Sequence, residues 1–106
     1  METIIKTDKE DILEFLRAKE EALSSFGVRT IGLFGSFARD EATPESDIDF
    51  LVEYEPGQKT FDNFMGLLLF LEAHFEQEIE LVTKESVSEH IWPYITQGLV
   101  YAEASH

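Results

Sequence analysis

A glycine–serine pair and a pair of aspartates, ten residues apart, have the residue types and spacing of a catalytic site. Gly35 and Ser36 end one apolar run, and Asp47 and Asp49 open the next. A glycine allows the backbone to turn sharply and to approach a ligand closely. The amides of a helical turn opened by Ser36 suit phosphate oxygens, and paired carboxylates suit a divalent cation. Together the two groups predict magnesium-dependent chemistry on a nucleoside triphosphate.

The spacing of the two aspartates places both side chains on the same face of a strand. Residues two apart on a strand have alpha carbons about 6.6 Å apart, so Asp47 and Asp49 could converge on one Mg²⁺ or share two ions. Without a cation the charges repel each other, and one carboxyl could then hold its proton. Such a pair by itself is more often an exposed acidic strand face. The preceding Gly35 and Ser36 favour the site.

A third carboxylate is predicted further along the chain. The segment Glu78–Val82 repeats the acid–apolar–acid pattern of Asp47–Leu51. If the two segments are neighbouring strands, Glu80 can point to the same face as the aspartates, although spacing alone does not choose it over Glu78. Three carboxylates could hold two Mg²⁺ ions about 3.5–4 Å apart, as in two-metal enzymes.

One arginine lies close to the glycine–serine pair. Arg39 is within one helical turn of Ser36. Its guanidinium could contact a phosphate of the nucleotide, or it could form a surface ion pair with Asp40 or Glu41. The sequence leaves both interpretations open.

Two apolar groups are interpreted as packing rather than as chemistry. Trp92 and Tyr94 form an aromatic cluster after His90, which predicts a core position rather than a platform for stacking a base. The run Leu67–Leu71 exceeds what one helix face needs. It is therefore buried on several sides, or part of it is an interface with a partner.

The elements that must position these residues follow from the apolar periodicity. A helix is predicted over residues 8–25, started by a capping box of Thr7 and Glu10 and ended by Gly27. The remaining predicted elements are strands over Val28–Phe34, Asp47–Tyr54 and Glu78–Val82, helices over Phe61–Phe75 and Lys84–Gln97, a helical turn over Ser36–Asp40 and a short strand over Leu99–Ala102. This order predicts an α+β (mixed α/β) fold with a small sheet packed with helices. The length of 106 residues predicts a single domain over residues 1–106.

The composition narrows the predicted partners and location. A net charge of −14 with eight basic residues argues against direct nucleic-acid binding, because such binding draws its affinity from Lys and Arg. The acidity either keeps a small protein soluble or complements a basic partner protein. The chain has no cysteine, no apolar run that could span a bilayer and no signal sequence. These absences predict a cytoplasmic protein without a membrane partner.

On these residues the chain resembles a minimal nucleotidyltransferase of the DNA polymerase β-like superfamily. That family has Gly-Ser, ten residues, Asp-x-Asp, and then a third carboxylate on a later strand. The local match is strongest from Gly35 to Val52, and length and element order match over the whole domain. Stand-alone members of this kind resemble the antitoxin half of HEPN/MNT toxin–antitoxin pairs.

The resemblance implies a role for each candidate residue. Family members usually have Asp-Leu-Val where this chain has Glu80-Leu81-Val82, so Glu80 aligns with the third carboxylate and is one methylene longer. The implied catalytic and metal-binding residues are Asp47, Asp49 and Glu80, with two Mg²⁺ ions, and the implied nucleotide-binding residues are Gly35, Ser36 and Arg39, with ATP as substrate.

The activity implied by the resemblance is transfer of AMP from ATP to a hydroxyl, with release of pyrophosphate. The acceptor would be a tyrosine of a cognate HEPN ribonuclease toxin. One alternative is a non-catalytic antitoxin that neutralises the toxin by binding and occlusion. Another is a transferase for a small molecule such as an antibiotic, although a chain of 106 residues has little surface left for such an acceptor.

Overall fold

The computed structural model describes residues 8–102, whose strands form one four-stranded mixed sheet. The strands are β1 (Val28–Phe34), β2 (Ile48–Tyr54), β3 (Ile79–Thr83) and β4 (Val100–Tyr101), and they lie in the order β3-β2-β1-β4. β1 is antiparallel to both β2 and β4, whereas β2 and β3 are parallel. The sheet and its helices confirm the predicted α+β class.

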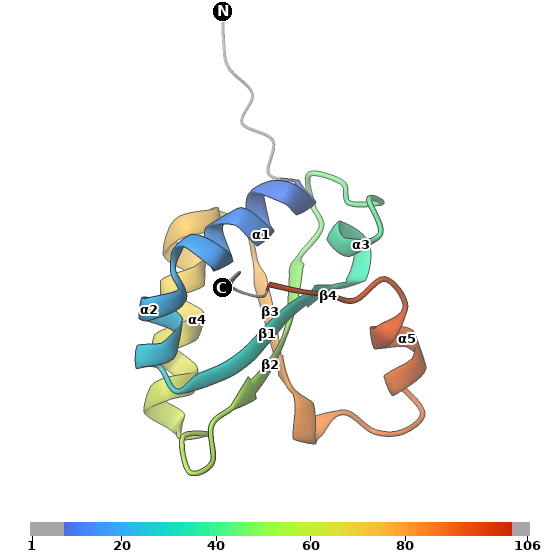
Figure 1. The fold of residues 1–106 in the computed structure, drawn as a ribbon. Coiled ribbons are helices and arrows are strands. Elements are labelled where there is room, and N and C mark those ends of the chain that lie inside the picture. The colour runs from blue at the N-terminus through green and yellow to red at the C-terminus, as the bar shows by residue number, and fades with distance from the viewer. Residues whose placement is uncertain (1–7, 103–106) are drawn as a thin grey trace, which may run out of the picture.

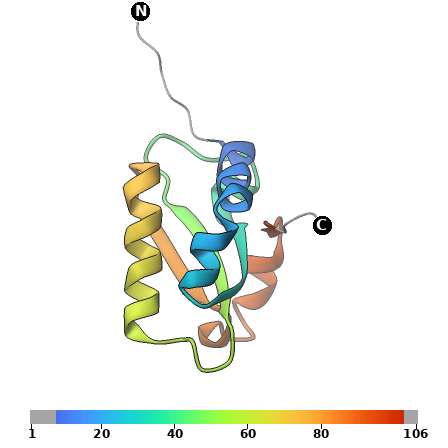
Figure 2. The ribbon, with the colours of Figure 1, turned by 60° about the vertical axis from the view of Figure 1, so that its left-hand side comes forward.

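Helices cover the two faces of the sheet unequally, as Figures 1 and 2 show. One face is covered by α1 (Lys9–Ala18), α2 (Glu20–Ser25) and α4 (Phe61–Phe75), and the other by α5 (Trp92–Thr96). Two short elements follow strands directly: α3 (Gly35–Ala38) after β1, and the 3₁₀ turn η1 (Lys84–Ser86) after β3. No helix within residues 8–102 is long and apolar enough to cross a membrane.

The alternation of side chains along β2 divides the interior into two clusters. Ile48, Phe50 and Val52 are fully buried in the larger cluster, on the face covered by α1, α2 and α4. Leu51 points the other way and packs with Phe34 and residues of α5. Each fully buried apolar side chain of this size stabilises the fold by about 1.5–3 kcal/mol. The alternation of apolar residues in Asp47–Tyr54 predicts Ile48, Phe50 and Val52 on one face and Asp49 and Leu51 on the other. The structure confirms this, and Asp49 lies on the α5 side.

Several predicted elements have the observed bounds, and the first helix does not. The strand Val28–Phe34 and the helix Phe61–Phe75 match their predictions. The predicted helix over residues 8–25 is instead interrupted at Lys19, where φ is −108° and ψ is 30°. The predicted capping residue Thr7 lies outside the described residues. Asp8 is the N-cap of α1, and its carboxylate accepts a hydrogen bond from the Asp11 amide at 3.0 Å.

The prediction of a long helix over Lys84–Gln97 is wrong. This segment forms η1, a loop, and then the five residues of α5. Pro93 lies in the first turn of α5, where proline is tolerated. A helix over Lys84–Gln97 would place it in the interior, where proline breaks a helix. The carbonyl of Ser88 accepts from the amides of both Ile91 and Trp92 at 3.1 Å, which starts the turn. The loop before α5 consequently lies beside the sheet face that carries Asp49.

Candidate functional site

The end of β1 brings Gly35 directly against the carboxylate of Asp49. Phe34, the last residue of β1, is opposite Asp49 in the antiparallel pair. The residue that follows, Gly35, therefore lies next to the Asp49 side chain. Gly35 is buried and has a φ of +78°, a conformation that residues with a Cβ rarely adopt. A Cβ added here would overlap the Oδ2 atom of Asp49. Both the backbone conformation and the close contact therefore require glycine.

The parallel pairing of β2 with β3 selects the neighbour of Asp49. Asp49 is paired with Glu80, and paired residues direct their side chains to the same face of a sheet. Glu78 instead precedes β3, and its carbonyl accepts from the Ile48 amide at 2.9 Å. The register thus answers the question that spacing alone left open, in favour of Glu80.

Asp47 lies just before β2, on a loop that is held by side-chain hydrogen bonds. The hydroxyl of Ser46 accepts from the Thr43 amide at 2.8 Å. The Gln77 side chain donates to the Ser46 carbonyl at 3.0 Å, which ties the loop to the segment before β3. Asp47 is exposed, whereas Asp49 is half-buried. The negative charge of Asp47 adds to the effect of burial and of Glu80 in raising the pKa of Asp49.

The carboxyl of Asp49 holds its proton more tightly than an ordinary aspartate. Burial raises its pKa from 3.8 to about 6, with further increases from the negative charges of Glu80 and Asp47, whereas Arg39 lowers it. Three acidic groups and one cationic group therefore act on one another at this point. The direction of the shift agrees with the repulsion expected between closely spaced carboxylates.

The donor set at this point fits a hard divalent cation. Within residues 8–102 no three acidic, histidine or cysteine side chains are arranged closely enough to form a ready-made metal site. The donors that meet here are nevertheless carboxylate oxygens, which are the ligands that Mg²⁺ prefers. Burial is the main cause of the raised pKa of Asp49, and a cation would relieve the repulsion from Glu80 and Asp47 that adds to it. Asp47, Asp49 and Glu80 are consequently the residues suited to hold it.

Arg39 is held between two side chains at the edge of this group. Its Nε donates to Glu41 Oε1 at 3.1 Å, and its guanidinium carbon lies 5.5 Å from the centroid of the Tyr94 ring. Asp40 pairs with Lys9 instead, at 3.4 Å. The surface ion pair is therefore made with Glu41, and such pairs contribute about 0–1 kcal/mol. Arg39 also acts electrostatically on Asp49, so the pairing does not remove it from the site.

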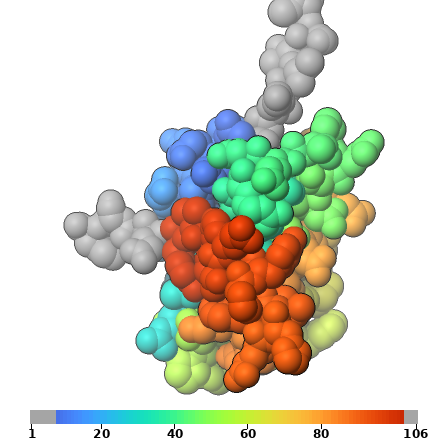
Figure 3. Space-filling view, turned by 90° about the vertical axis from the view of Figure 1, so that its right-hand side faces the viewer, coloured from blue at the N-terminus to red at the C-terminus, as the bar shows by residue number. Residues whose placement is uncertain are grey.

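A cavity of about 400 Å³ opens beside the carboxylates, on the sheet face that carries α5. Figure 3 shows this face, with the orange-to-red segment that contains α5 below the green segment of α3 and its following loop. The lining residues on the sheet are Phe34, Asp49, Glu80 and Val82, and those from η1, the loop and α5 are Ser86, Val87, Ser88, Ile91, Tyr94 and Ile95. Two of the predicted carboxylates thus face a largely apolar hollow.

The wall formed by α5 is the part of the site that sequence reasoning missed. The prediction that Tyr94 belongs to the core is wrong, because 55% of this residue is exposed and it lines the cavity. Trp92, in contrast, packs against the smaller apolar cluster. The adjacent aromatic residues and proline were the available signal, but they indicated packing as readily as a binding wall. Gly35, Asp49 and Glu80 are brought together, with Asp47 and Arg39 close by.

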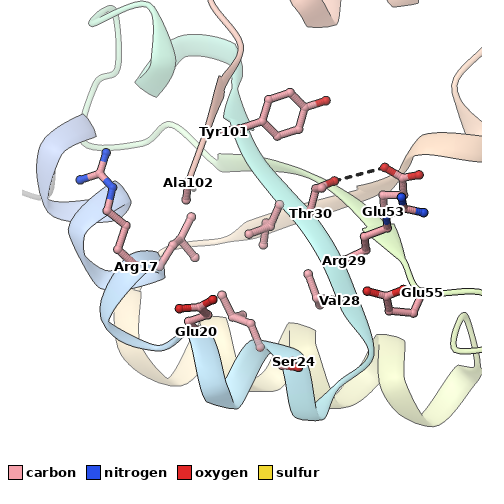
Figure 4. A pocket seen from close by; sticks show the side chains of 13 residues that line it. Arg17, Glu20, Ser24, Val28, Arg29, Thr30, Glu53, Glu55, Tyr101 and Ala102 are labelled. Carbon is pink, nitrogen blue, oxygen red and sulfur yellow. Dashed lines mark hydrogen bonds between the residues drawn. The ribbon is translucent and has the colours of Figure 1, made fainter. Parts of the chain in front are cut away.

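A larger cavity of about 540 Å³ lies away from these carboxylates, between the α1–α2 segment and the first residues of β1, Val28–Ile31. Figure 4 shows Arg17 and Glu20 on its helical side and Thr30 and Glu53 on its strand side. The Thr30 hydroxyl donates to Glu53 at 3.3 Å. None of the predicted site residues lines this cavity. The chemistry therefore belongs to the smaller hollow.

A sequence profile described as "Nucleotidyltransferase domain" matches residues 10–102. The chain belongs to the nucleotidyltransferase family. It is 39% identical over 93 residues to a protein of Thermococcus cleftensis named protein adenylyltransferase MntA, covering 87% of this chain and 93% of that relative. These matches make the chain an enzyme of the adenylyltransferase type.

Solved structures share the fold of this nucleotidyltransferase. One, provisionally described as a minimal nucleotidyltransferase, is 31% identical with a TM-score of 0.67, covering 89% of this chain and 95% of that chain. Another is described as the tri-AMPylated HEPN toxin of Shewanella oneidensis in complex with MNT antitoxin. It is 18% identical with a TM-score of 0.60, covering 88% of this chain and 73% of that chain. At that identity the likeness shows the fold.

The ionised carboxylate of Asp49 is expected to destabilise the metal-free nucleotidyltransferase. The pKa of Asp49 in the folded protein is about 6, above the ordinary value of 3.8. The free energy of unfolding therefore falls as pH rises from about 4 to about 6, and the full destabilisation is present above about pH 6. A shift of this size corresponds to roughly 3 kcal/mol for a fully buried group, and partial exposure reduces it to about 1 kcal/mol. Asp49→Asn should therefore melt higher than the wild type at pH 8.

Thermal unfolding in the presence of a chelator measures this effect. The gap between Asp49→Asn and wild type should be present at pH 8 and should largely close at pH 4, where the aspartate is neutral in the folded protein. Asp62→Asn, at an exposed aspartate in the first turn of α4, serves as the control. It should melt slightly lower than wild type at pH 8, the opposite sign, because a negative charge is favourable at a helix N-terminus. A gap that is equal at the two pH values would contradict the assignment.

Proposed function

We propose that this nucleotidyltransferase moves AMP from ATP to a tyrosine hydroxyl of a cognate HEPN toxin, in a magnesium-dependent reaction, and thereby acts as its antitoxin. The observation that carries the proposal is the position of the Asp49 carboxylate, between Gly35 and Glu80 at the edge of a cavity. Relatives add support, since one is named a protein adenylyltransferase and another is described in complex with an AMPylated toxin.

AMP transfer exchanges one oxygen–phosphorus bond of ATP for a new one to the tyrosine. The tyrosine oxygen attacks the α-phosphorus of ATP and forms a new oxygen–phosphorus bond. The bond between the α-phosphorus and its bridging oxygen breaks, and pyrophosphate leaves. The proton of the hydroxyl passes to a carboxylate, for which Glu80 is the candidate beside Asp49. Mg²⁺ held by Asp47, Asp49 and Glu80 would supply charge stabilisation at the α-phosphate and activation of the hydroxyl.

The nucleotide would lie against the turn that follows β1. Because Gly35 has no side chain, a ligand can approach the backbone closely there. Gly35 and Ser36 are the first two residues of the short helical turn α3, and Arg39 is its C-cap. The guanidinium of Arg39 is a suitable partner for phosphate oxygens, since it combines a permanent charge with several fixed donors. We assign Gly35, Ser36 and Arg39 to the triphosphate on these grounds.

Transfer of label tests the proposal directly. The protein is incubated with a purified HEPN partner, Mg²⁺ and ATP labelled at the α-phosphate. Label should appear on a tyrosine of the partner and should disappear when that tyrosine is replaced by phenylalanine or when Mg²⁺ is chelated. A partner that stays unlabelled while ATP and Mg²⁺ are present would overturn the proposed function.

Neutralisation by binding alone is the second candidate, and one surface feature favours it. Phe61 is 76% exposed and Leu69 is 57% exposed on α4, although this helix carries an apolar run. Exposed large apolar residues on an acidic protein suit contact with a partner that has a basic rim. Toxin activity should then fall without ATP. Under the proposed function, inhibition instead requires ATP.

Glu80 offers a graded test of the third carboxylate. Glu80→Gln removes the negative charge and is expected to lower AMP transfer about a hundredfold, which is the order expected for weakened charge stabilisation of the transition state. Glu80→Asp keeps the charge and should retain most of the rate. Glu78→Gln is the matched control, because Glu78 precedes β3, and should stay within about twofold. Equal losses in Glu78→Gln and Glu80→Gln would refute the choice of Glu80.

A further inference from the structure

We propose that Tyr94 is a positioning residue, which holds the Arg39 guanidinium at the nucleotide site. The inference rests on the proposed function, because it assigns Arg39 to the triphosphate. Tyr94 lines the same cavity as Asp49 and Glu80, and its ring lies 5.5 Å from the guanidinium carbon of Arg39. Guanidinium groups are attracted to the faces of aromatic rings at such distances.

The position of Tyr94 is set by its buried neighbour on α5. Ile95 is only 3% exposed and packs in the smaller apolar cluster with Phe34 and Leu51. This contact anchors α5 to the sheet face that carries the carboxylates. Tyr94 precedes the anchor by one residue and is left at the edge of the cavity, with 55% of its surface exposed. The ring is therefore held near Arg39 by packing that does not involve Arg39.

Arg39 is constrained by three separate contacts. Glu41 accepts from its Nε at 3.1 Å, and Tyr94 lies against its guanidinium. The aliphatic stem passes over Gly98, where a Cβ would lie 3.1 Å from Arg39 Cγ. Gly98 also has a φ of +82°, so the turn after α5 is built around this stem. Two of the three contacts come from α5 and the turn that follows it.

One donor of Arg39 is left without a partner. Its Nη1 atom is buried and has no hydrogen-bond acceptor among the residues that the structure describes. An unpaired buried donor is unfavourable, particularly on a charged group. A phosphate oxygen would satisfy it, because guanidinium–phosphate hydrogen bonds are charge-assisted and short. The contacts with Glu41 and Tyr94 therefore orient a side chain whose buried, unpaired Nη1 suits an anionic ligand.

The test is the affinity for a non-hydrolysable ATP analogue with Mg²⁺, measured by calorimetry, together with steady-state kinetics of AMP transfer. Tyr94→Ala should weaken binding about fivefold and raise the KM for ATP similarly, a size typical of a cation–π contact, while kcat changes less than about twofold. Tyr94→Phe keeps the ring and should stay within about twofold of wild type in affinity. In a protein that already carries Arg39→Ala, Tyr94→Ala should cause no further loss of affinity, because Tyr94 affects nucleotide binding only by positioning Arg39.

Tyr101→Ala is the matched control, since Tyr101 is an exposed tyrosine that lines the other cavity, and its affinity should be unchanged. The inference is overturned if Tyr94→Ala binds as tightly as wild type or tighter, or if its loss persists in full on the Arg39→Ala background. A wild-type protein that neither binds the analogue nor transfers AMP overturns the proposed function as well. Binding that is lost in Arg39→Ala but kept in Tyr94→Ala overturns the inference alone.

Discussion

Replacing Asp47 and Asp49 together by asparagine is expected to lower AMP transfer at least about a thousandfold, because the site then loses two of its three anionic donors. This factor corresponds to about 4 kcal/mol of transition-state stabilisation. Asparagine has nearly the same shape as aspartate, so the β1–β2 pairing and the buried residues of β2 should be unaffected. The loss should therefore occur in a protein that is still folded.

Stability separates this result from a folding defect. The ionised Asp49 is unfavourable in the metal-free protein, so the double variant should melt at or above the wild-type temperature at pH 8. Mg²⁺ should raise the melting temperature of the wild type and should have little effect on the variant. Asp62→Asn should match wild type in AMP transfer and in its response to Mg²⁺, since Asp62 is exposed on α4 and lies outside the carboxylate group. Undiminished AMP transfer by the double variant would rule out these aspartates as metal ligands.

Gly35→Ala is expected to lower AMP transfer about a hundredfold and also to destabilise the protein. An alanine at a φ of +78° costs about 1–2 kcal/mol of strain. Its Cβ would in addition overlap Asp49 Oδ2, so the carboxylate has to move away from the turn. A displacement of this kind disturbs both groups that the nucleotide and the cation would contact. Unfolding midpoints and AMP transfer are measured on the same preparation.

Gly57→Ala supplies a control that is matched for backbone conformation. Gly57 has a φ of +79°, and a Cβ added there meets nothing within 4 Å. Its substitution should show the same strain of about 1–2 kcal/mol and leave AMP transfer unchanged. The difference between the two variants then reports the contact with Asp49 alone. If Gly57→Ala lost as much activity as Gly35→Ala, strain rather than contact would explain both.

The crowded carboxylates have opposite effects on stability and on metal binding. Burial and the neighbouring carboxylates together raise the pKa of Asp49 and weaken the metal-free fold, yet the same negative charges are what a divalent cation requires. The glycine at the end of β1 allows this crowding, because it leaves space for Asp49 where another residue would not. Removing the carboxylates is therefore expected to lower activity while stabilising the metal-free fold, whereas replacing the glycine is expected to lower both activity and stability.

The amino-acid sequence by itself determined the elements that carry the site. Apolar alternation placed Ile48, Phe50 and Val52 on one face of β2 and Asp49 on the other. The apolar residues of Phe61–Phe75 likewise indicated the bounds of α4. These features could be predicted because burial of every second or every third to fourth residue is a local property of the chain. The glycine–serine pair and Asp-x-Asp could likewise be recognised from spacing alone.

Only the tertiary structure decided which distant residues complete the site. The parallel register of β2 with β3 paired Asp49 with Glu80 instead of Glu78, although both carry the same acidic group. Pro93 restricted the last helix to α5, and burial of Ile95 then left Tyr94 beside Arg39. Strand register and helix docking depend on contacts between residues far apart in the chain. Local periodicity contains no information about these long-range contacts. The predicted site therefore lacked the cavity wall formed by α5, and Tyr94 was assigned to the core.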